Sequence, residues 1–212
     1  MNKLLIFDLD GTLLNTIEDI CTSINKALSH YNLPLHDISK IKRMVGNGVD
    51  KLIERAVYPH LECFNDVKDF YLKDYNANCS NKTKPYDGIK ELLMKFKING
   101  HKLAVLSNKP HHDTIKVINS YFGESCFDYV IGNKKENRIK PHPDGVNEII
   151  RALNWKELVV FIGDSEVDVK TAINSDCIGI AVLWGFREKE ELLGANYFVS
   201  DCDELFNIIE RL

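Results

Sequence analysis

Residues 4–12 read Leu4-Leu5-Ile6-Phe7-Asp8-Leu9-Asp10-Gly11-Thr12, so a short apolar run ends directly in two aspartates and a glycine. Side chains alternate along an extended chain, so Asp8 and Asp10 point the same way, and at ~4 Å like charges repel by roughly 4 kcal/mol at an effective dielectric of ~20. A bound cation would relieve this repulsion. Because adjacent acids stabilise a buried strand end poorly, the stretch indicates chemistry at the end of a strand.

Further apolar runs predict a sheet around this strand. Near-continuous apolar runs are typical of parallel strands that are buried on both faces, and they occur at residues 4–7, 103–106, 158–162 and 178–183, with weaker examples at 129–131 and 197–199. Between them, apolar residues keep helical spacing at residues 88–99, 113–122 and 143–153. This alternation predicts a doubly wound α/β sheet, a Rossmann-like core.

The interval from residue 15 to residue 81 breaks the alternation, because it contains only helical patterns such as Ile17, Ile20 and Ile24. We therefore expect a small all-helical cap domain over residues 15–81, inserted after the first strand. Residues 1–14 and 82–212 would form the α/β catalytic core. Asn15-Thr16 is expected to be the outgoing linker and residues 76–84 the return linker. An insert beside a strand end is well placed to act as a lid.

Composition restricts the class of partner. The chain has 27 Lys and Arg against 31 Asp and Glu, a net charge of −4 with both signs mixed, so we expect no nucleic-acid partner. No apolar run approaches ~20 residues, so we expect no membrane span. The six cysteines are scattered without a Cys-x-x-Cys pair, and the start does not read as a signal peptide. We expect a cytoplasmic protein with reduced thiols, as a monomer or homodimer.

Polar groups follow several of the predicted strands. In a doubly wound sheet, ligands bind at the carboxyl ends of the strands, near the point where the connections diverge. Besides Asp8 and Asp10 after the first strand, these groups are Ser107-Asn108-Lys109 after the second, Lys140-Pro141-His142-Pro143 before the fourth, and Gly163-Asp164-Ser165 after the fourth, with Asp168 one turn later. Acids, a hydroxyl and a lysine would then face one cavity, as phosphoryl transfer requires.

These four segments, in this order, resemble the motifs of the haloacid dehalogenase-like superfamily of hydrolases, in its phosphoglycolate phosphatase-like branch with a helical cap. The similarity covers essentially the whole chain, and the ordered set of four is far more specific than any one motif. Two shorter stretches also look like this branch: residues 43–48 in the cap, and Trp184-Gly185-Phe186-Arg187.

The resemblance implies a Mg²⁺-dependent phosphatase that hydrolyses a small phosphorylated metabolite, with phosphoglycolate the first candidate, through an aspartyl-phosphate. Asp8 would be the nucleophile. Asp10 would protonate the leaving oxygen and later take a proton from water. Mg²⁺ would be held by Asp8, the main-chain carbonyl of Asp10, and Asp164.

Other residues would bind the phosphoryl group. The resemblance implies that Ser107 hydrogen-bonds a phosphoryl oxygen, helped by main-chain amides near Gly11 and Asn108, and that Lys140 supplies a positive charge. Asp168 would support the cavity by orienting Lys140 or metal-bound water. Taken alone, Ser107-Asn108 and Asp164 also fit ordinary helix caps.

The cap and the remaining motif residues offer substrate contacts. Thr12 is expected to position Asp10, and Gly46 and Asn47 to form a turn that faces the active site. Arg43 would grip a substrate carboxylate or a distal phosphate, although an exposed helix arginine is the alternative. Lys134, Lys135 and Arg138 fit a solvated basic loop.

Several other functions remain open from the sequence. A phosphomutase uses the same covalent intermediate, and a pyrophosphatase of the same superfamily is a further alternative. Dehalogenation is disfavoured because Asp10, the proton shuttle for an alcohol leaving group, is present. A phospho-signalling receiver shares an acceptor aspartate, a hydroxyl and a lysine, but the helical insert and the position of Asp8 argue against it. A partner-binding module without activity is the last alternative.

Overall fold

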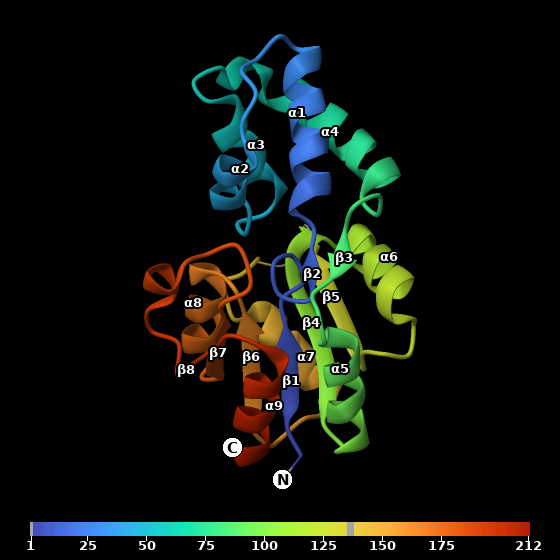
Figure 1. Cartoon of the computed structure of the whole chain (residues 1–212), viewed down its shortest axis with the longest axis vertical. Helices are drawn as coiled ribbons and strands as arrows, with labels where there is room; N and C mark the ends of the chain where they lie inside the picture. The colour runs from blue at the N-terminus through green and yellow to red at the C-terminus, as the bar shows by residue number, and fades with distance from the viewer. Residues whose placement is uncertain (1, 135–137) are drawn as a thin grey trace.

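The computed structural model describes residues 2–134 and 138–212, so Lys135 lies outside the described residues. A six-stranded parallel sheet forms the centre of the molecule, in the order β5-β4-β1-β6-β7-β8 (Figure 1). The strands are β1 Leu4–Phe7, β4 Lys102–Pro110, β5 Tyr129–Asn133, β6 Val159–Gly163, β7 Ile178–Val182 and β8 Tyr197–Val199. The predicted doubly wound sheet is confirmed, and both of the weaker strand predictions correspond to strands.

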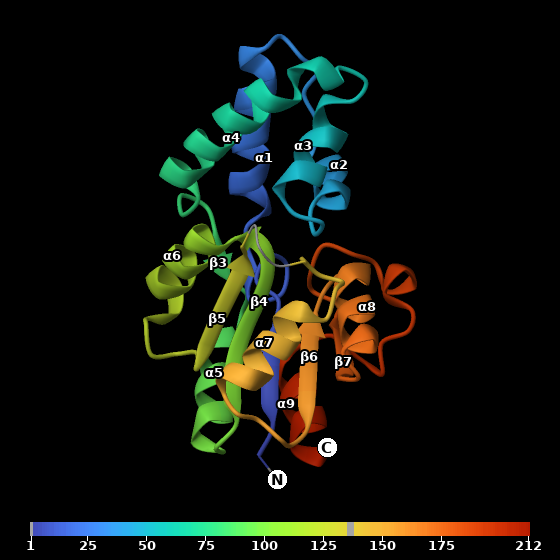
Figure 2. The ribbon, with the colours of Figure 1, turned by 180° about the vertical axis from the view of Figure 1, so that it is seen from behind.

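Helices cover both faces of the sheet. The apolar cores show which helix belongs to which face: Leu5 and Phe7 of β1 pack with α5, α6 and α9, while Leu4 and Ile6 pack with α7 and α8. Figure 2 shows α7 across the second face. The bounds are α5 Ile89–Ile98, α6 His111–Phe122, α7 Asp144–Ala152, α8 Glu166–Asn174 and α9 Cys202–Arg211. Because β1 is buried on both sides, its sequence is apolar at every position.

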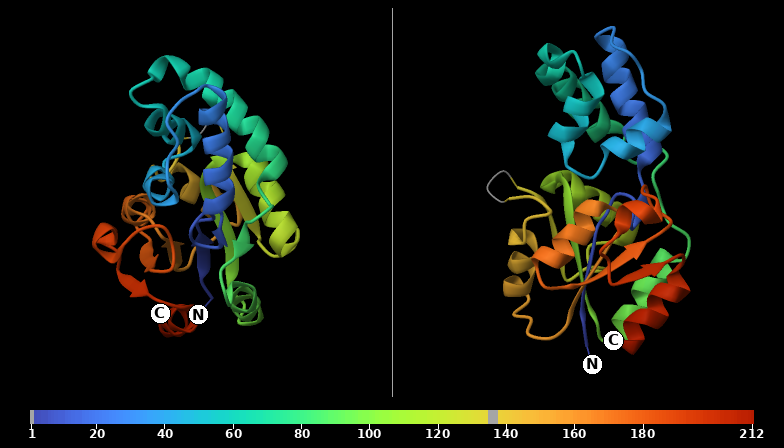
Figure 3. Two further views of the ribbon diagram at one scale, coloured as in Figure 1. Left: turned by 45° about the horizontal axis from the view of Figure 1, so that its top comes forward. Right: turned by 90° about the vertical axis from the view of Figure 1, so that its left-hand side faces the viewer.

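Four helices lie between residues 15 and 84 and stand beyond the carboxyl ends of the strands (Figures 1 and 3). They are α1 Ile17–His30, α2 Ile38–Met44, α3 Val49–Val57 and α4 Phe64–Asn78, with a short 3₁₀ turn, η1, at Leu61–Cys63. Their apolar faces pack on one another, and Ile24, Leu28 and Ile53 are completely buried. We propose residues 15–81 as a cap domain on this basis.

The two connections to this helical segment differ from the expected loops. β2 (Leu14–Asn15) and β3 (Lys84–Pro85) pair as a small antiparallel ribbon. Asp19 in the first turn of α1 accepts hydrogen bonds from the backbone amides of Lys82 and Thr83, at 3.0 and 2.8 Å to Oδ2. Two strand residues per side are too few for a periodicity to reveal, so the sequence predicted only a linker.

Two further differences from the predicted elements are a longer β4 and an additional turn before β8. β4 continues through the polar residues Ser107, Asn108 and Lys109 to Pro110, beyond the apolar run that predicted it. A 3₁₀ turn, η2, covers Lys189–Leu192 before β8. In the described part of the chain, no helix is both long enough and apolar enough to cross a membrane.

Candidate active site

The site lies where β1, β4 and β6 end, at the point where the chain turns from one half of the sheet to the other. Asp8 follows β1 directly, Ser107 lies in the last part of β4, and Asp164 follows β6. Since β1 pairs with both neighbours in parallel, the three strand ends lie side by side. Side chains about 100 and 156 positions away from Asp8 in the sequence therefore meet at one edge, as this fold class requires.

The turn after β1 is closed by backbone hydrogen bonds from Leu13 and Leu14 to the carbonyl of Leu9, both of 3.0 Å. Gly11 in this turn has φ of +90°. A Cβ at this position would collide with the carboxylate of Asp164. Glycine is therefore needed here for two reasons, the left-handed backbone and the close approach of an acidic side chain.

Three buried carboxylates form the acidic centre. Asp8, Asp164 and Asp168 each place a carboxylate oxygen within 4.8 Å of the others. Burial is the largest cause that raises the pKa of Asp8, and the neighbouring acids add to it, while Lys140 opposes them. Burial and Asp168 raise the pKa of Asp164 to about 7. Hard oxygen ligands crowded out of water fit a Mg²⁺ ion.

Lys140 is the cation at this centre. Its Nζ lies 2.7 Å from Asp8 Oδ1 and 2.7 Å from Asp168 Oδ1, and its side chain is only 2% exposed. Although burial lowers its pKa, the two acids raise it above the usual value, so the ammonium stays charged. Asn108 holds the lysine backbone, because its Oδ1 accepts from Lys140 N at 2.9 Å and its Nδ2 donates to Lys140 O at 3.1 Å.

Asp168 and Asp164 also accept hydrogen bonds from neighbouring backbone and side-chain groups. Asp168 accepts from Ser165 N at 3.0 Å and from Ser165 Oγ at 2.6 Å through Oδ2, which completes the capping box that begins α8. Ser165, and not Asp164, is therefore the N-cap of that helix. Thr12 donates to Asp164 Oδ1 at 3.1 Å, and the amide of Phe186 donates to Oδ2 at 2.8 Å. The structure thus places Thr12 against Asp164 instead of Asp10.

Asp10 does not join the acidic cluster; its carboxylate pairs with Lys109. The Lys109 Nζ lies 3.0 and 3.1 Å from the two oxygens of Asp10 and 2.9 Å from the hydroxyl of Tyr75. Neither Lys109 nor Tyr75 was predicted from the sequence to have a role of its own. A signal existed for Lys109, since it follows Ser107-Asn108 directly, but none existed for Tyr75, which belongs to α4 and looks like an ordinary apolar helix residue.

A cleft opens above these groups. One end is polar and is lined by Asp8, Asp10, Ser107, Asn108 and Lys109. The other walls come largely from the helical segment and are mostly apolar: Ile20, Val45, Val49, Leu52, Tyr71, Leu72 and Tyr75. Charged groups at one end of an apolar cleft suit a small ligand with an anionic head group.

Of the three residues of the helical segment that were predicted to contact the substrate, only one lines the cleft. Gly46 lines the cleft, and its carbonyl accepts from Asn108 Nδ2 at 3.0 Å. Asn47 instead accepts from Arg55 Nη2 at 2.7 Å and lines a shallow open groove outside the cleft. Arg43 is exposed and is not among the residues that line the cleft. The geometry therefore gives no support to Arg43 as a substrate ligand.

Arg187 joins the core to the helical segment, a role that the sequence did not indicate. Its guanidinium is buried and donates to the carbonyls of Lys42 and Val45, both at 2.7 Å, at the end of α2. Glu166 accepts from its Nε at 3.1 Å. The same segment contributes the Phe186 amide that holds Asp164. One short stretch thus contacts both a carboxylate of the site and the helices above it.

Comparison with known proteins places this geometry in a family. Residues 5–182 match the family model described as haloacid dehalogenase-like hydrolase. A phosphoglycolate phosphatase of Mannheimia succiniciproducens is 31% identical, with 98% of each chain covered. A crystal structure from Haemophilus somnus, described as a predicted phosphoglycolate phosphatase, superposes with a TM-score of 0.91 at 28% identity and covers 98% of both chains. A predicted phosphatase from Clostridium acetobutylicum gives 0.88 at 29% identity over the whole of both chains.

The family model extends from the first residues of β1 to the end of β7, so it spans all four segments in which the motifs were found. The relatives are matched over nearly their full length, which includes the helical segment between β1 and β4. The resemblance drawn from the motifs is confirmed, and the chain belongs to the haloacid dehalogenase-like hydrolases.

Proposed function

We propose that this hydrolase is a Mg²⁺-dependent phosphatase that acts on a small phosphorylated metabolite through an aspartyl-phosphate on Asp8. One observation carries the proposal: the buried Asp8 carboxylate lies at the polar end of the cleft, 2.7 Å from the Lys140 ammonium and beside Asp164. Such surroundings suit the attack of a carboxylate on the phosphorus of a dianion, because they supply positive charge where oxygens carry negative charge.

In the first step, an Asp8 oxygen forms a bond to phosphorus while the bond from phosphorus to the leaving oxygen breaks. Asp10 donates a proton to that oxygen, and the product alcohol leaves. In the second step, water attacks phosphorus while the bond from phosphorus to the Asp8 oxygen breaks. Asp10 takes a proton from the water, and inorganic phosphate is released, which leaves Asp8 free again. Lys140 stays charged through both steps and offsets charge on the phosphoryl oxygens, with Ser107 and main-chain amides near Gly11 and Asn108 as hydrogen-bond donors.

Asp8, Asp164 and the main-chain carbonyl of Asp10 would hold Mg²⁺, with Asp168 as a supporting acid that orients Lys140. Bound Mg²⁺ would supply electrostatic stabilisation of the transferring phosphoryl group. The fit rests on the three carboxylate oxygens within 4.8 Å of one another, which one lysine only partly neutralises.

Phosphoglycolate is the first candidate substrate. The relatives that carry this substrate in their names cover nearly the whole of the chain. The walls of the cleft are largely apolar, so they offer few hydrogen-bond partners to a large polar substrate. The helical segment supplies most of those walls, so the identity of the leaving group would be selected there.

The test is a screen of phosphorylated metabolites, measured as kcat/KM from the release of inorganic phosphate with Mg²⁺ and after chelation. Phosphate release separates hydrolysis from transfer to a second hydroxyl. We expect activity with Mg²⁺ only, and Asp8→Asn is expected to lower it by at least about 10³-fold because the nucleophile is lost.

Asp203→Asn is the matched control, because its side chain is 90% exposed on α9, away from the site. It is expected to keep full activity. Asp10→Asn should still accept phosphate on Asp8 from an activated substrate but release it slowly. A folded, Mg²⁺-loaded protein that hydrolyses nothing in the screen would contradict the proposed function.

A further inference from the structure

A second buried lysine serves the other aspartate of the Asp-x-Asp pair. Lys140 contacts Asp8 and Asp168, whereas Lys109 contacts Asp10. Lys109 lines the cleft, yet its side chain is only 5% exposed. In the proposed reaction Lys140 offsets charge on the phosphoryl oxygens, whereas Lys109 has no part. A buried charge that is kept beside an acid/base group needs a reason, because removal of an ammonium from water is costly.

The contacts of Lys109 use its whole hydrogen-bonding capacity. An ammonium has three donors, and Lys109 directs them at Asp10 Oδ1 (3.0 Å), Asp10 Oδ2 (3.1 Å) and the hydroxyl of Tyr75 (2.9 Å). Its backbone amide is occupied as well, since it donates to Ser107 Oγ at 3.2 Å. With all donors engaged, the lysine is built to hold Asp10 and is not a vacant site for a substrate anion.

Tyr75 fixes the lysine from the helical segment. The ammonium lies 4.7 Å from the centre of the Tyr75 ring as well as against its hydroxyl, so a cation–π contact adds to the hydrogen bond. Tyr71 stacks on Tyr75 with ring centres 5.4 Å apart, and both tyrosines are buried. Burial raises the pKa of Tyr75 well above its usual value, so the phenol stays neutral, and its oxygen accepts a hydrogen bond from Lys109.

The charge state of Lys109 agrees with this geometry. Burial is the largest single cause and lowers its pKa, but the charge and hydrogen bonds of Asp10, together with neighbouring groups, raise the pKa above its usual value, so the group remains an ammonium. When Asp10 carries a proton on one oxygen, the other oxygen still accepts from Lys109. The same contact can therefore hold the carboxyl group in its acid form and in its base form.

We propose that Lys109 and Tyr75 are positioning residues that aim the Asp10 carboxyl group at the leaving-group oxygen, so that helix α4 contributes to the orientation of the acid catalyst. This inference rests on the proposed function. It predicts a dependence on the leaving group: a poorly positioned acid matters little when the leaving group departs easily as an anion, and matters most when that group must be protonated.

The experiment measures kcat/KM for p-nitrophenyl phosphate, phenyl phosphate and 2-phosphoglycolate, whose leaving groups need increasing protonation. For Lys109→Met we expect losses of about twofold, about tenfold and about 10²-fold along this series. Tyr75→Phe keeps the ring and removes only the hydroxyl, so it should lose less in the same order. It also keeps the test decisive if Lys109→Met does not fold.

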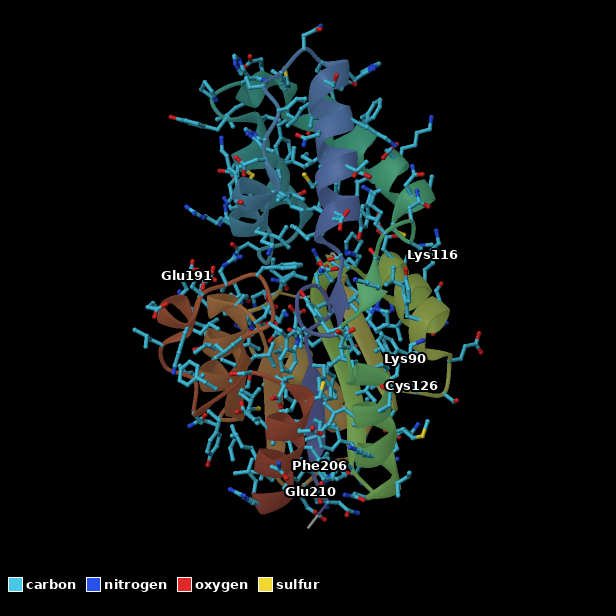
Figure 4. All side chains as sticks on the ribbon, viewed as in Figure 1. Lys90, Lys116, Cys126, Glu191, Phe206 and Glu210 are labelled. Atoms are coloured by element: carbon cyan, nitrogen blue, oxygen red, sulfur yellow. The ribbon has the colours of Figure 1, made fainter. Side chains whose placement is uncertain are left out.

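The matched control is Lys90→Met, because Lys90 is an exposed lysine on α5 (Figure 4). It should leave all three values within about twofold of the unaltered enzyme. Equal losses on all three substrates, or no loss, would overturn the proposal, since a merely structural role does not sense the leaving group. A loss confined to 2-phosphoglycolate would overturn it too, because the lysine would then bind the substrate carboxylate.

The two aryl phosphates carry no second anion, so they separate proton donation from charge recognition. Failure of the inference is also distinct from failure of the proposed function. In the first case the unaltered enzyme hydrolyses all three substrates, but the losses of kcat/KM in the variants do not follow the leaving group. In the second case the unaltered enzyme hydrolyses none of the three.

Discussion

Among single residues, Asp164 has the most unusual surroundings. Its two carboxylate oxygens accept from Thr12 and from the Phe186 amide, and these donors favour the ionised form. Burial and the nearby Asp168 outweigh them and raise its pKa from 3.8 to about 7. The ionised Asp164 carboxylate does not stabilise the fold, because it is buried and lies beside a second acid. A bound cation would relieve the repulsion between the crowded carboxylates, so the same arrangement favours cation binding.

This pKa predicts how the effect of Mg²⁺ depends on pH. Without metal, protonated Asp164 favours the folded state, so its contribution to stability is complete below about pH 4 and is lost as the pH rises to about 7. Mg²⁺ binds the ionised group, so its stabilisation should grow over the same window. We expect a rise in Tm near zero at about pH 5 and of roughly 5 °C at about pH 8 under saturating Mg²⁺.

Differential scanning calorimetry with and without Mg²⁺ checks this prediction. Asp164→Asn serves as the reference, since it removes a carboxylate charge at constant size and should show no rise at either pH. An equal Mg²⁺ effect at both pH values in the unaltered protein would show that the ion binds elsewhere.

Among the elements, α2 depends on a side chain from the opposite part of the molecule. A helix leaves its last carbonyls without donors, and at the end of α2 the Arg187 guanidinium supplies them for Lys42 and Val45. Arg55 does the same for Met44, with a distance of 2.8 Å from Nη1. The turn that follows α2 lines the cleft, so these two guanidinium groups hold a wall of the site.

Arg187→Met should therefore release α2. We expect a loss of about 2 kcal/mol in stability, because buried carbonyls lose charged donors, and a fall in kcat/KM of about tenfold. Hydrogen exchange of the α2 amides should become faster. The control is Glu191→Gln, since Glu191 lies 4.0 Å from Arg187 and is half exposed on the surface (Figure 4). Unchanged exchange in α2 would contradict the role of Arg187.

The ribbon of β2 and β3 has its own anchor. Asp19 accepts from the amides of Lys82 and Thr83 and from the Thr83 hydroxyl, the last at 2.8 Å. It thereby ties the start of α1 to the chain that returns from the helical segment.

Asp19→Ala is expected to lower the free energy of unfolding by about 3 kcal/mol, measured by urea denaturation, because several charge-assisted hydrogen bonds are lost. Glu18→Gln is the neighbouring control. The Glu18 carboxylate lies 3.4 Å from the Lys82 ammonium, and both side chains are more than half exposed, so the substitution should cost less than about 1 kcal/mol. Similar costs for both variants would rule out the anchor.

For the whole molecule, the important feature is a single apolar core that runs from the helical segment into one face of the sheet. It joins Ile24 of α1 and Ile53 of α3 to Leu103 of β4 and Leu205 of α9 without a break. The ribbon and the turn after β1 supply the connecting residues, among them Leu14. The helical segment and the sheet therefore share their stabilisation.

A shared core predicts one cooperative unfolding transition. Ile24→Ala and Leu103→Ala, which alter opposite ends of the cluster, should each cost about 2–5 kcal/mol and lower the same transition. Calorimetry, with circular dichroism to follow the helices, distinguishes this from separate melting. Two transitions, with Ile24→Ala affecting only one, would show that the cap folds by itself.

The sequence alone determined the α/β class, every strand of the main sheet and the chemical groups at its edge. Burial on both faces makes a strand apolar at each position, and a strand end is where the apolar run stops, so Asp8 and Asp164 were placed by local pattern. The order of the four motifs then indicated the family. These features depend on neighbours in the chain, which a sequence displays directly.

Only the tertiary structure decided which groups touch. Thr12 reaches Asp164 instead of Asp10, Lys109 pairs with Asp10 under Tyr75, and Arg187 holds the end of α2. Most of these partners lie about 100 or more positions apart, and no periodicity links them. Their contacts follow from how the helical segment packs over the strand ends, which is a property of the folded molecule because packing brings together residues that have no relation along the chain.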